Sequence, residues 1–160
     1  MSPNLTSEQV WRQIEKQIFG VLGLVTAKGE ARTVGVVYIV HNRQLFISTQ
    51  KQAWKTRHIA QNPSVSFTIP IHKQIPFLPW IQIPAATITF SGEATVQDAE
   101  NISREISHKL HRGQEGTPFN LQDTAVISIQ PNGEFITYGV GVSLMDMRFP
   151  EKAQGRATVK

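Results

Sequence analysis

Residues 32–40 form an apolar run that limits the folds open to this chain, because hydrophobic side chains occupy both faces of the strand that the run would make. The even positions from 34 to 40 carry Val, Val, Tyr and Val, and positions 37 and 39 carry Val and Ile. Neighbouring side chains of a strand point to opposite faces, so both faces need cover, as in a closed barrel or at a subunit interface. The sequence therefore favours a sheet that curls around a core or meets a second copy.

Turn residues on either side of this run join it to two further predicted strands. Lys28-Gly29 separates it from residues 21–27, and His41-Asn42-Arg43 separates it from residues 44–49. Such turns between apolar runs predict antiparallel hairpins. Further strands are expected at 64–69, at 85–96 with a bulge at Gly92, and at 123–129 and 134–138 around a turn at 130–133.

Three helices are expected between these strands. The first lies within residues 1–20 and ends near residue 20, because Thr6-Ser7-Glu8-Gln9 opens like a capping box and Val10, Ile14 and Ile18 recur at four-residue spacing. The others are expected at 52–61 and at 98–111, the latter capped by Asp98. The pattern predicts one mainly β domain over residues 1–160, a six- to seven-stranded antiparallel barrel with short flanking helices and a C-terminal tail at 139–160.

Residues 70–84 interrupt this pattern with four of the nine prolines of the chain. Neither a helix nor a central strand tolerates that density of proline. Because Phe77, Leu78 and Trp80 lie among these prolines, we expect a long apolar loop that packs on another surface. Residues 113–117 are expected to form a second loop.

Residues 31–92 contain six basic residues and no carboxylate, within a chain whose net charge is +4. This asymmetry favours an anionic partner such as a phosphate and disfavours a two-carboxylate hydrolase or a carboxylate-ligated metal site in the stretch. The chain has no cysteine, which excludes disulfides, thiolate metal sites and a catalytic thiol. It also shows neither a signal peptide nor a run of about 18 apolar residues. We therefore expect a cytoplasmic protein with no membrane partner.

The segment from residue 46 to residue 58 carries the most informative chemistry. A predicted strand ends in the hydroxyls of Ser48 and Thr49, and the next helix presents Lys51, Lys55 and His58 at spacings of four and three. Hydroxyls, free helix N–H groups and a lysine one turn in are the donors that bind a phosphate.

Arg32, at the start of the neighbouring predicted strand, is expected to reach the same place. The alternative is that Lys51, Lys55 and Arg57 are only the solvated face of a short helix, and spacing alone does not separate the two interpretations. The five histidines include no pair with metal-ligand spacing, so no metal site is expected.

The order of these pieces resembles the pyridoxamine 5′-phosphate oxidase-like family of FMN-binding split barrels, over roughly residues 8–138. The pieces are Gly23-Leu-Val-Thr-Ala-Lys-Gly, Arg32-Thr-Val-Gly-Val-Val-Tyr, Leu45-Phe-Ile-Ser-Thr, Trp54-Lys55 with Ile59-Ala-Gln-Asn-Pro63, Ser64-Val-Ser-Phe-Thr, and Thr87-Ile-Thr-Phe-Ser-Gly-Glu-Ala.

The resemblance implies a split barrel that forms a homodimer, with FMN at the subunit interface. Lys55 would bind the FMN phosphate, Ser48 and Thr49 would hydrogen-bond it, and the backbone of residues 34–36 would line the isoalloxazine ring. Gly35 fits this role, because a missing side chain lets a flat ring approach the backbone. The implied cofactor-binding residues are Arg32, Thr33, Val34, Gly35, Val36, Ser48, Thr49, Lys51, Trp54, Lys55 and Thr87.

Three departures from the oxidase itself argue against oxidation of pyridoxamine phosphate. Trp54 stands where the oxidase has an arginine before the lysine, and Thr87 stands where it has a flavin-contacting glutamine. No segment after Tyr138 matches its C-terminal substrate-binding region. The tail resembles instead that of small uncharacterised members.

Two functions are therefore kept open, and the sequence assigns a catalytic residue to neither. The first is an FMN-dependent oxidoreductase that passes electrons between a reduced nicotinamide and a small-molecule acceptor. The second is a non-catalytic module that binds FMN, haem, a bilin or a deazaflavin coenzyme. Nucleic-acid binding is disfavoured, because the basic residues are few and aromatic residues do not interleave with them.

Overall fold

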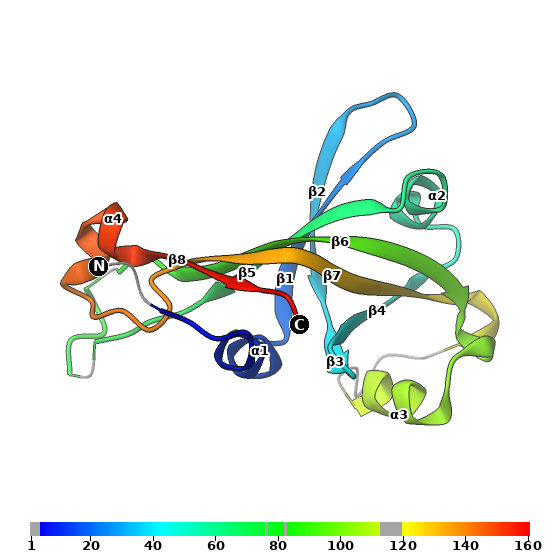
Figure 1. Cartoon of the computed structure of the whole chain (residues 1–160). Helices are drawn as coiled ribbons and strands as arrows, with labels where there is room; N and C mark the ends of the chain where they lie inside the picture. The colour runs from blue at the N-terminus through cyan, green and yellow to red at the C-terminus, as the bar shows by residue number, and fades with distance from the viewer. Residues whose placement is uncertain (1–3, 76, 82, 113–119) are drawn as a thin grey trace.

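The computed structural model describes residues 4–75, 77–81, 83–112 and 120–160. These residues form an eight-stranded antiparallel sheet with the strand order β2-β1-β5-β6-β7-β4-β3, and β8 pairs with β7 outside this path (Figure 1). The strands are β1 (Phe19–Val25), β2 (Ala31–Val37), β3 (Ile39–His41), β4 (Gln44–Gln50), β5 (Ser64–Ile71), β6 (Ala86–Asp98), β7 (Thr124–Tyr138) and β8 (Gln154–Thr158).

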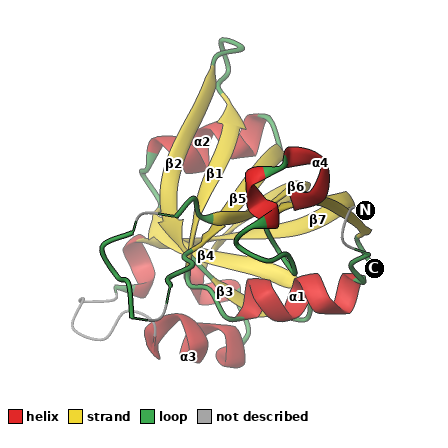
Figure 2. Cartoon of the chain, turned by 90° about the vertical axis from the view of Figure 1, so that its left-hand side faces the viewer, coloured by secondary structure: helices red, strands yellow, loops and turns green. Residues whose placement is uncertain are grey.

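Short helices flank the sheet, and Figure 2 shows α1 and α3 on one side of it and α2 beside the β1–β2 hairpin. The α-helices are α1 (Ser7–Glu15), α2 (Trp54–Gln61), α3 (Arg104–Arg112) and α4 (Pro150–Ala153), and single 3₁₀ turns are η1 (Ala99–Asn101), η2 (Leu121–Asp123) and η3 (Asp146–Arg148). The predicted mainly β split barrel with flanking helices is confirmed, with eight strands instead of six or seven.

The predicted strand at 32–40 is two strands, β2 and β3, which lie at opposite ends of the strand order although only Tyr38 separates them in the chain. Tyr38 is 1% exposed. Its backbone N–H donates to the carbonyl of Ile18 at 2.9 Å, and its hydroxyl donates to the carbonyl of Ile14 at 2.8 Å. This anchored bend carries the chain from one end of the sheet to the other, so the sheet must curl.

A chain of buried aromatic rings fills the curl. Tyr38 meets Phe67 edge-on with ring centroids 5.5 Å apart, and Phe67 stacks on Phe90 at 5.7 Å. Phe90 meets Phe135 at 5.6 Å, and Phe135 meets Trp11 of α1 at 5.5 Å. The core therefore runs from the bend at Tyr38 through three strands to α1, whose last turn also receives the Tyr38 hydroxyl.

The outer face of β2 is not covered by the described residues. Val36 is buried on the inner face, as expected, but Val37 on the outer face is 48% exposed. Phe19, which pairs with Val37 across the ladder, is 46% exposed. The second cover that the apolar run predicts is not provided by the described residues.

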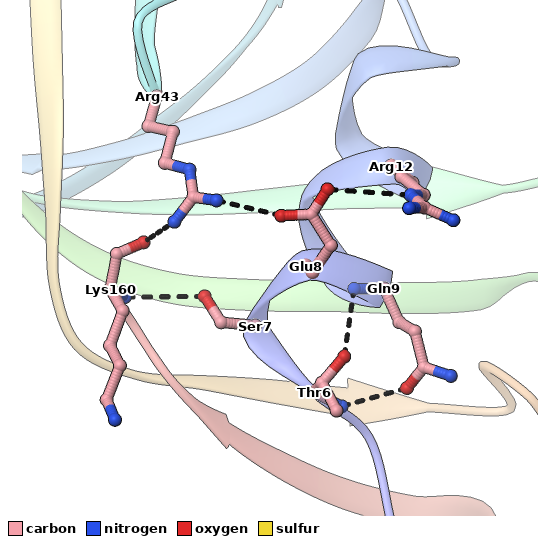
Figure 3. A network of polar contacts seen from close by, with 7 residues as sticks. All are labelled: Thr6, Ser7, Glu8, Gln9, Arg12, Arg43 and Lys160. Atoms are coloured by element: carbon pink, nitrogen blue, oxygen red, sulfur yellow. Dashed lines mark hydrogen bonds and ion pairs between the residues drawn. The ribbon is translucent and has the colours of Figure 1, made fainter.

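Helix α1 is shorter than predicted. Its capping box is present, since Thr6 Oγ1 accepts from the Gln9 N–H at 3.3 Å and Gln9 Oε1 accepts from the Thr6 N–H at 2.9 Å (Figure 3). The helix ends at Glu15 instead of near residue 20, and Ile18 is 70% exposed. Gly20 belongs to β1, where a Cβ would lie 2.3 Å from the Phe67 ring, so packing in the sheet overrides the helical spacing.

A polar network joins the start of α1 to the β3–β4 turn and to Lys160 (Figure 3). Arg43 Nη2 lies 2.8 Å from Glu8 Oε2, and Arg43 also donates to the Lys160 carbonyl. The Lys160 N–H donates to Ser7 Oγ at 3.3 Å, and Arg12 Nε lies 3.6 Å from Glu8 Oε1. These groups are largely exposed, so the network fixes positions more than it adds stability.

Two predictions in the second half of the sheet are wrong in detail. The two strands expected around a turn at 130–133 are one continuous strand, β7. The first part of β7 pairs with β4, its last part pairs with β8, and β6 pairs with both parts. The register shift of β6 lies between Thr89 and Ser91, not at Gly92. Gly92 is required for close approach instead, because a Cβ there would lie 2.8 Å from the Gln130 carbonyl oxygen.

The helix predicted at 98–111 begins later. Residues 99–101 form η1, and α3 starts at Arg104, where Ser103 Oγ accepts from the Ile106 N–H at 3.3 Å. Asp98 makes no side-chain cap and pairs with Lys51 instead. Helix α2 begins at Trp54 and not at residue 52. The loop expected at 113–117 lies outside the described residues.

The tail after Tyr138 folds back on the sheet, which the sequence analysis missed. It forms η3, α4 and β8, and the Gly139 N–H donates to the Ala153 carbonyl at 2.8 Å. The loop expected at 70–84 begins two residues later, because Pro70 and Ile71 belong to β5 and pair with Thr87 and Ala86 of β6. The described part of 72–84 contains neither helix nor strand, and the Lys73 amine donates to the carbonyls of Gly139 and Val142. Phe77 and Trp80 are 94% and 73% exposed, so the surface expected to cover the loop is not among the described residues.

We expect Tyr38→Phe to lower the free energy of unfolding by about 1 kcal/mol, because it removes one buried hydrogen bond and keeps the ring. Tyr38→Ala should cost about 3–5 kcal/mol, since it also opens a cavity in the aromatic chain. Urea denaturation followed by circular dichroism measures both. Trp80→Ala, on the exposed loop, is the matched control and should stay within about 0.5 kcal/mol of the wild type. Equal midpoints for wild type and Tyr38→Phe would contradict the anchoring role.

Candidate functional site

The predicted phosphate site lies where β4 ends and α2 begins, and α2 lies beside the projecting β1–β2 hairpin (Figures 1 and 2). Ser48 and Thr49 are half-buried near the end of β4. The connecting turn is held by the Lys51 N–H, which donates to the Asp123 carbonyl at 2.9 Å. Helix α2 has no side-chain cap at Ala53, so its first N–H groups remain open to an anion.

Lys55, in the first turn of α2, is half-buried and has no ion pair or hydrogen-bond partner among the residues that the structure describes. Burial lowers the pKa of Lys55 from its ordinary value, because desolvation disfavours the ammonium form. A partly desolvated amine without a counter-charge is a group that a bound anion would stabilise.

Lys51 is not free in the same way. Its Nζ lies 3.4 Å from Asp98 Oδ1, at the last residue of β6. Because Asp98 lies outside the acid-free stretch and far from Lys51 along the chain, no local sequence pattern predicts this pair. Lys51 is therefore turned toward the end of β6, although it remains close to the start of α2 along the chain.

Arg32 does not lie on a strand that pairs with β4, as the sequence predicted, but it still comes close to the start of α2. Strand β2 is separated from β4 in the sheet, and Arg32 Nη2 lies 2.9 Å from Glu30 Oε2. Arg32 lines a cavity of about 550 Å³ between the β1–β2 turn and α2. The residues that line the cavity are Thr26, Ala27, Lys28, Glu30, Arg32, Thr33, Trp54 and His58.

The structure thus brings Arg32, Thr33 and Trp54 together and adds His58 and Glu30 to them. His58 Nδ1 accepts from the Ala27 N–H at 3.4 Å, and its ring lies 6.1 Å from the Trp54 ring. Glu30 was not among the predicted site residues. It directly precedes β2, and its spacing of two from Arg32 is the signal that could have found the pair.

Gly35 and its two neighbours on β2 point to opposite faces of the strand. Val36 is buried in the core and Val34 is half-buried, whereas Gly35 is exposed on the outer face. A Cβ at Gly35 would lie 2.9 Å from the Phe19 ring, so the flat ring that approaches this backbone within one chain is that of Phe19.

Thr87 is not brought to α2 within one chain. It pairs with Pro70 and Tyr138 near the start of β6, whereas Asp98, the partner of Lys51, is the last residue of that strand.

The described residues contain no group of three or more His, Asp or Glu side chains able to hold a metal ion. None of the described helices is long and apolar enough to cross a membrane.

Comparison with known structures places this geometry among split barrels. A pyridoxamine 5′-phosphate oxidase-like protein of Listeria innocua matches with a TM-score of 0.60 at 18% identity, over 78% of this chain and 92% of that one. An F420 reductase matches with a TM-score of 0.57 at 18% identity, over 83% and 97%. A haem-binding protein of Mycobacterium smegmatis matches with a TM-score of 0.67 at 14% identity, over 99% of this chain and 60% of that one. At these identities the likeness shows the fold alone.

In sequence, no curated protein matches the chain. The model of the pyridoxamine 5′-phosphate oxidase family, however, matches residues 6–136, which include β1 to β6 and most of β7. The matched region carries the β4–α2 junction and the cavity beside it. With the fold and the family model in agreement, the chain belongs to the pyridoxamine 5′-phosphate oxidase family.

Proposed function

We propose that this protein binds FMN and is an oxidoreductase that passes electrons between a reduced nicotinamide and a small-molecule acceptor. The observation that carries the proposal is Lys55, a half-buried ammonium without a described partner at an uncapped helix start. The phosphate of FMN supplies the charge that this position lacks, and the helix N-terminus adds favourable dipoles. Bound FMN would supply the redox chemistry, and the protein would supply position and electrostatics.

The residues of the site have distinct roles in this proposal. Lys55 pairs with the phosphate, and the hydroxyls of Ser48 and Thr49 donate to its oxygens. Lys51, already paired with Asp98, contributes only positive field nearby. The backbone of residues 34–36 faces the flavin ring once the Phe19 side chain moves aside, which its exposure permits.

The proposed active form is a homodimer. Three exposed apolar side chains lie close together: Ile18 just before β1, Phe19 at the start of β1 and Val37 at the end of β2. A second copy of the chain would remove this apolar surface from water. Thr87 lies near the start of β6, at the opposite end of the strand from Asp98 and so far from Lys51 of its own chain. In the dimer, Thr87 would contact the cofactor held by the partner subunit. Arg32, Thr33 and Trp54 would border the phosphate end of the cofactor from the cavity side. The cytoplasm, expected from the sequence, is where reduced nicotinamides are available.

Lys55→Ala should weaken FMN binding by roughly 1.5–3 kcal/mol, the scale of a lost charge-assisted hydrogen bond. Quenching of flavin fluorescence on titration measures the Kd. Arg57→Ala is the matched control, because Arg57 lies on the same helix but is exposed, and it should change the Kd much less. Equal losses for the two variants would assign the effect to general charge and remove Lys55 from the phosphate site.

The ligand-free protein gives a second check on Lys55. Because burial lowers the pKa of Lys55, its charge opposes folding, and the protein gains stability as pH rises through that lowered value. Lys55→Gln should therefore not reduce the free energy of unfolding in the absence of FMN. A clear loss of stability would mean that Lys55 has a structural partner in the folded chain.

FMN affinity should also depend on pH in a defined direction. The phosphate gains its second charge near pH 6, so affinity should rise through that range. It should fall again in the alkaline range, where Lys55 loses its proton at a pKa below its ordinary value. Lys55→Arg keeps the charge and should abolish the alkaline fall. An identical alkaline fall in Lys55→Arg would show that another group is responsible.

A non-catalytic binding module is the second candidate, favoured by the likeness to the haem-binding protein of Mycobacterium smegmatis. His58 does not support iron ligation, because its Nδ1 already accepts from Ala27 and its proton then lies on Nε2. We expect the purified protein to show flavin absorption bands and anaerobic reduction by NADH or NADPH. A Soret band, or bound flavin that neither donor reduces, would favour the module.

A further inference from the structure

We propose that two exposed aromatic side chains of the β5–β6 connection, Phe77 and Trp80, form the acceptor-binding wall of the flavin site in the partner subunit. This wall selects a flat, uncharged acceptor of the quinone type. The inference rests on the proposed flavin function and deepens it, because it names the class of acceptor and the residues that select it. None of these residues belongs to the predicted cofactor-binding set.

The connection leaves the sheet directly beside Thr87. The β5–β6 ladder ends with the pairs Pro70–Thr87 and Ile71–Ala86, and the connection extends beyond them. Figure 1 shows it at the end of the sheet opposite α2. Thr87 lies about 36 Å from Asp98 along β6, at the usual rise of a strand. A dimer that brings Thr87 to the partner's cofactor therefore brings this connection there as well.

The base of the connection is fixed to the sheet by Lys73. Its amine donates to the carbonyl of Gly139 and, at 3.0 Å, to the carbonyl of Val142. Gly139 directly follows Tyr138, which pairs with Thr87 from the other side of β6. The connection is thus held beside Thr87, and the Lys73 amine is engaged by backbone carbonyls.

The tip of the connection presents two aromatic rings, because Phe77 and Trp80 are 94% and 73% exposed. Two turn hydrogen bonds hold the backbone around them. The Leu78 N–H donates to the Ile75 carbonyl at 3.2 Å, and the Ile81 N–H donates to the Leu78 carbonyl at 3.1 Å. Phe77 also has a φ of 72°, a left-handed backbone that bulky residues rarely adopt. Such strained residues cluster at ligand sites, so the rings are placed as a binding surface.

The composition of the connection sets the class of acceptor. Residues 74–84 contain no charged side chain, and the Lys73 amine before them is already engaged. A charged acceptor would lose hydration against this wall without gaining an ionic partner. A flat, uncharged aromatic compound would instead stack on the rings of Phe77 and Trp80.

A quinone meets these conditions and takes up the electrons that the proposed reaction delivers. One reduced nicotinamide, one proton and one quinone give the oxidised nicotinamide and the hydroquinone. The donor thus loses a hydride, and the acceptor gains two electrons and two protons. Bound FMN would carry the electrons between them, and the wall would hold the quinone.

Binding of 1,4-naphthoquinone to the oxidised, FMN-loaded protein tests the wall without turnover, and isothermal titration calorimetry measures the Kd. Trp80→Ala should raise this Kd by about 2- to 13-fold, the range that one aromatic pair contributes. Trp80→Phe keeps a ring and should restore most of the affinity. Naphthoquinone-2-sulfonate, which adds one charge to the same ring system, should bind more weakly. Leu121→Ala, an exposed apolar residue of η2 next to η1 at the far end of β6, is the matched control and should change neither Kd.

Mixed dimers test whether the wall acts across the subunits. Lys55→Ala and Trp80→Ala chains are mixed at an FMN concentration that fills only intact sites, and naphthoquinone-dependent oxidation of NADH or NADPH is measured. A mixed dimer contains one site with Lys55 from one chain and Trp80 from the other, so activity should exceed the mean of the two parents. Activity at that mean would place the wall within its own chain and overturn the inference.

The outcomes separate this inference from the proposed function. If FMN binds and a nicotinamide reduces it, but Trp80→Ala leaves the naphthoquinone Kd unchanged, the wall is refuted and the proposed function stands. The same holds if Trp80→Ala weakens dimerisation and FMN binding as strongly as quinone binding, because the rings then only seal the dimer. If FMN does not bind, the proposed function fails. Trp80-dependent binding of naphthoquinone to the flavin-free protein would then still support the wall, and no such binding would overturn it.

Discussion

The bend at Tyr38 is the constraint on which the rest of the structure depends. It puts β2 and β3 at opposite ends of one strand order while they remain neighbours in the chain, so the sheet can satisfy both only by curling. The Tyr38 hydroxyl and the ring chain from Tyr38 to Trp11 both lead to α1, which fixes the curl from two directions. Because β2 is held in this way, its first residues face α2 across a cavity and its outer face stays open.

Much of this architecture could be predicted from the sequence, because most of it is local. Apolar runs between turn residues located the strands, and the capping box located the start of α1. The errors occurred where distant segments decide the outcome. Ile18 follows the helical spacing of α1, yet Gly20 has to fit against the Phe67 ring, so the chain turns to strand earlier. The turn residues at 130–133 stay within one strand because β6 pairs with β7 on both sides of the register shift, where Gly133 takes a positive φ.

The candidate site divides in the same way. Ser48, Thr49 and Lys55 follow one another along β4 and α2, so their chemistry was readable as a local pattern. The partners of the other cations were not, because Asp98 reaches Lys51 only through the pairing of β6 with β7 and β7 with β4. The neighbouring strand expected for Arg32 was wrong for a related reason. Consecutive predicted strands were taken as neighbours, whereas β1 and three further strands separate β2 from β4.

The acid-free stretch gains a sharper meaning once its six basic residues are placed. Four of them have partners from outside the stretch: Arg32 has Glu30, Arg43 has Glu8, Lys51 has Asp98, and Lys73 has two backbone carbonyls. Of the remaining two, Arg57 is exposed and solvated, and only Lys55 is half-buried without a partner among the described residues. The absence of a carboxylate matters most beside Lys55, because an Asp or Glu side chain there would pair with the ammonium and take the place of an anionic ligand. The missing counter-charge at Lys55, more than the net charge of the chain, is therefore what supports the proposed phosphate site.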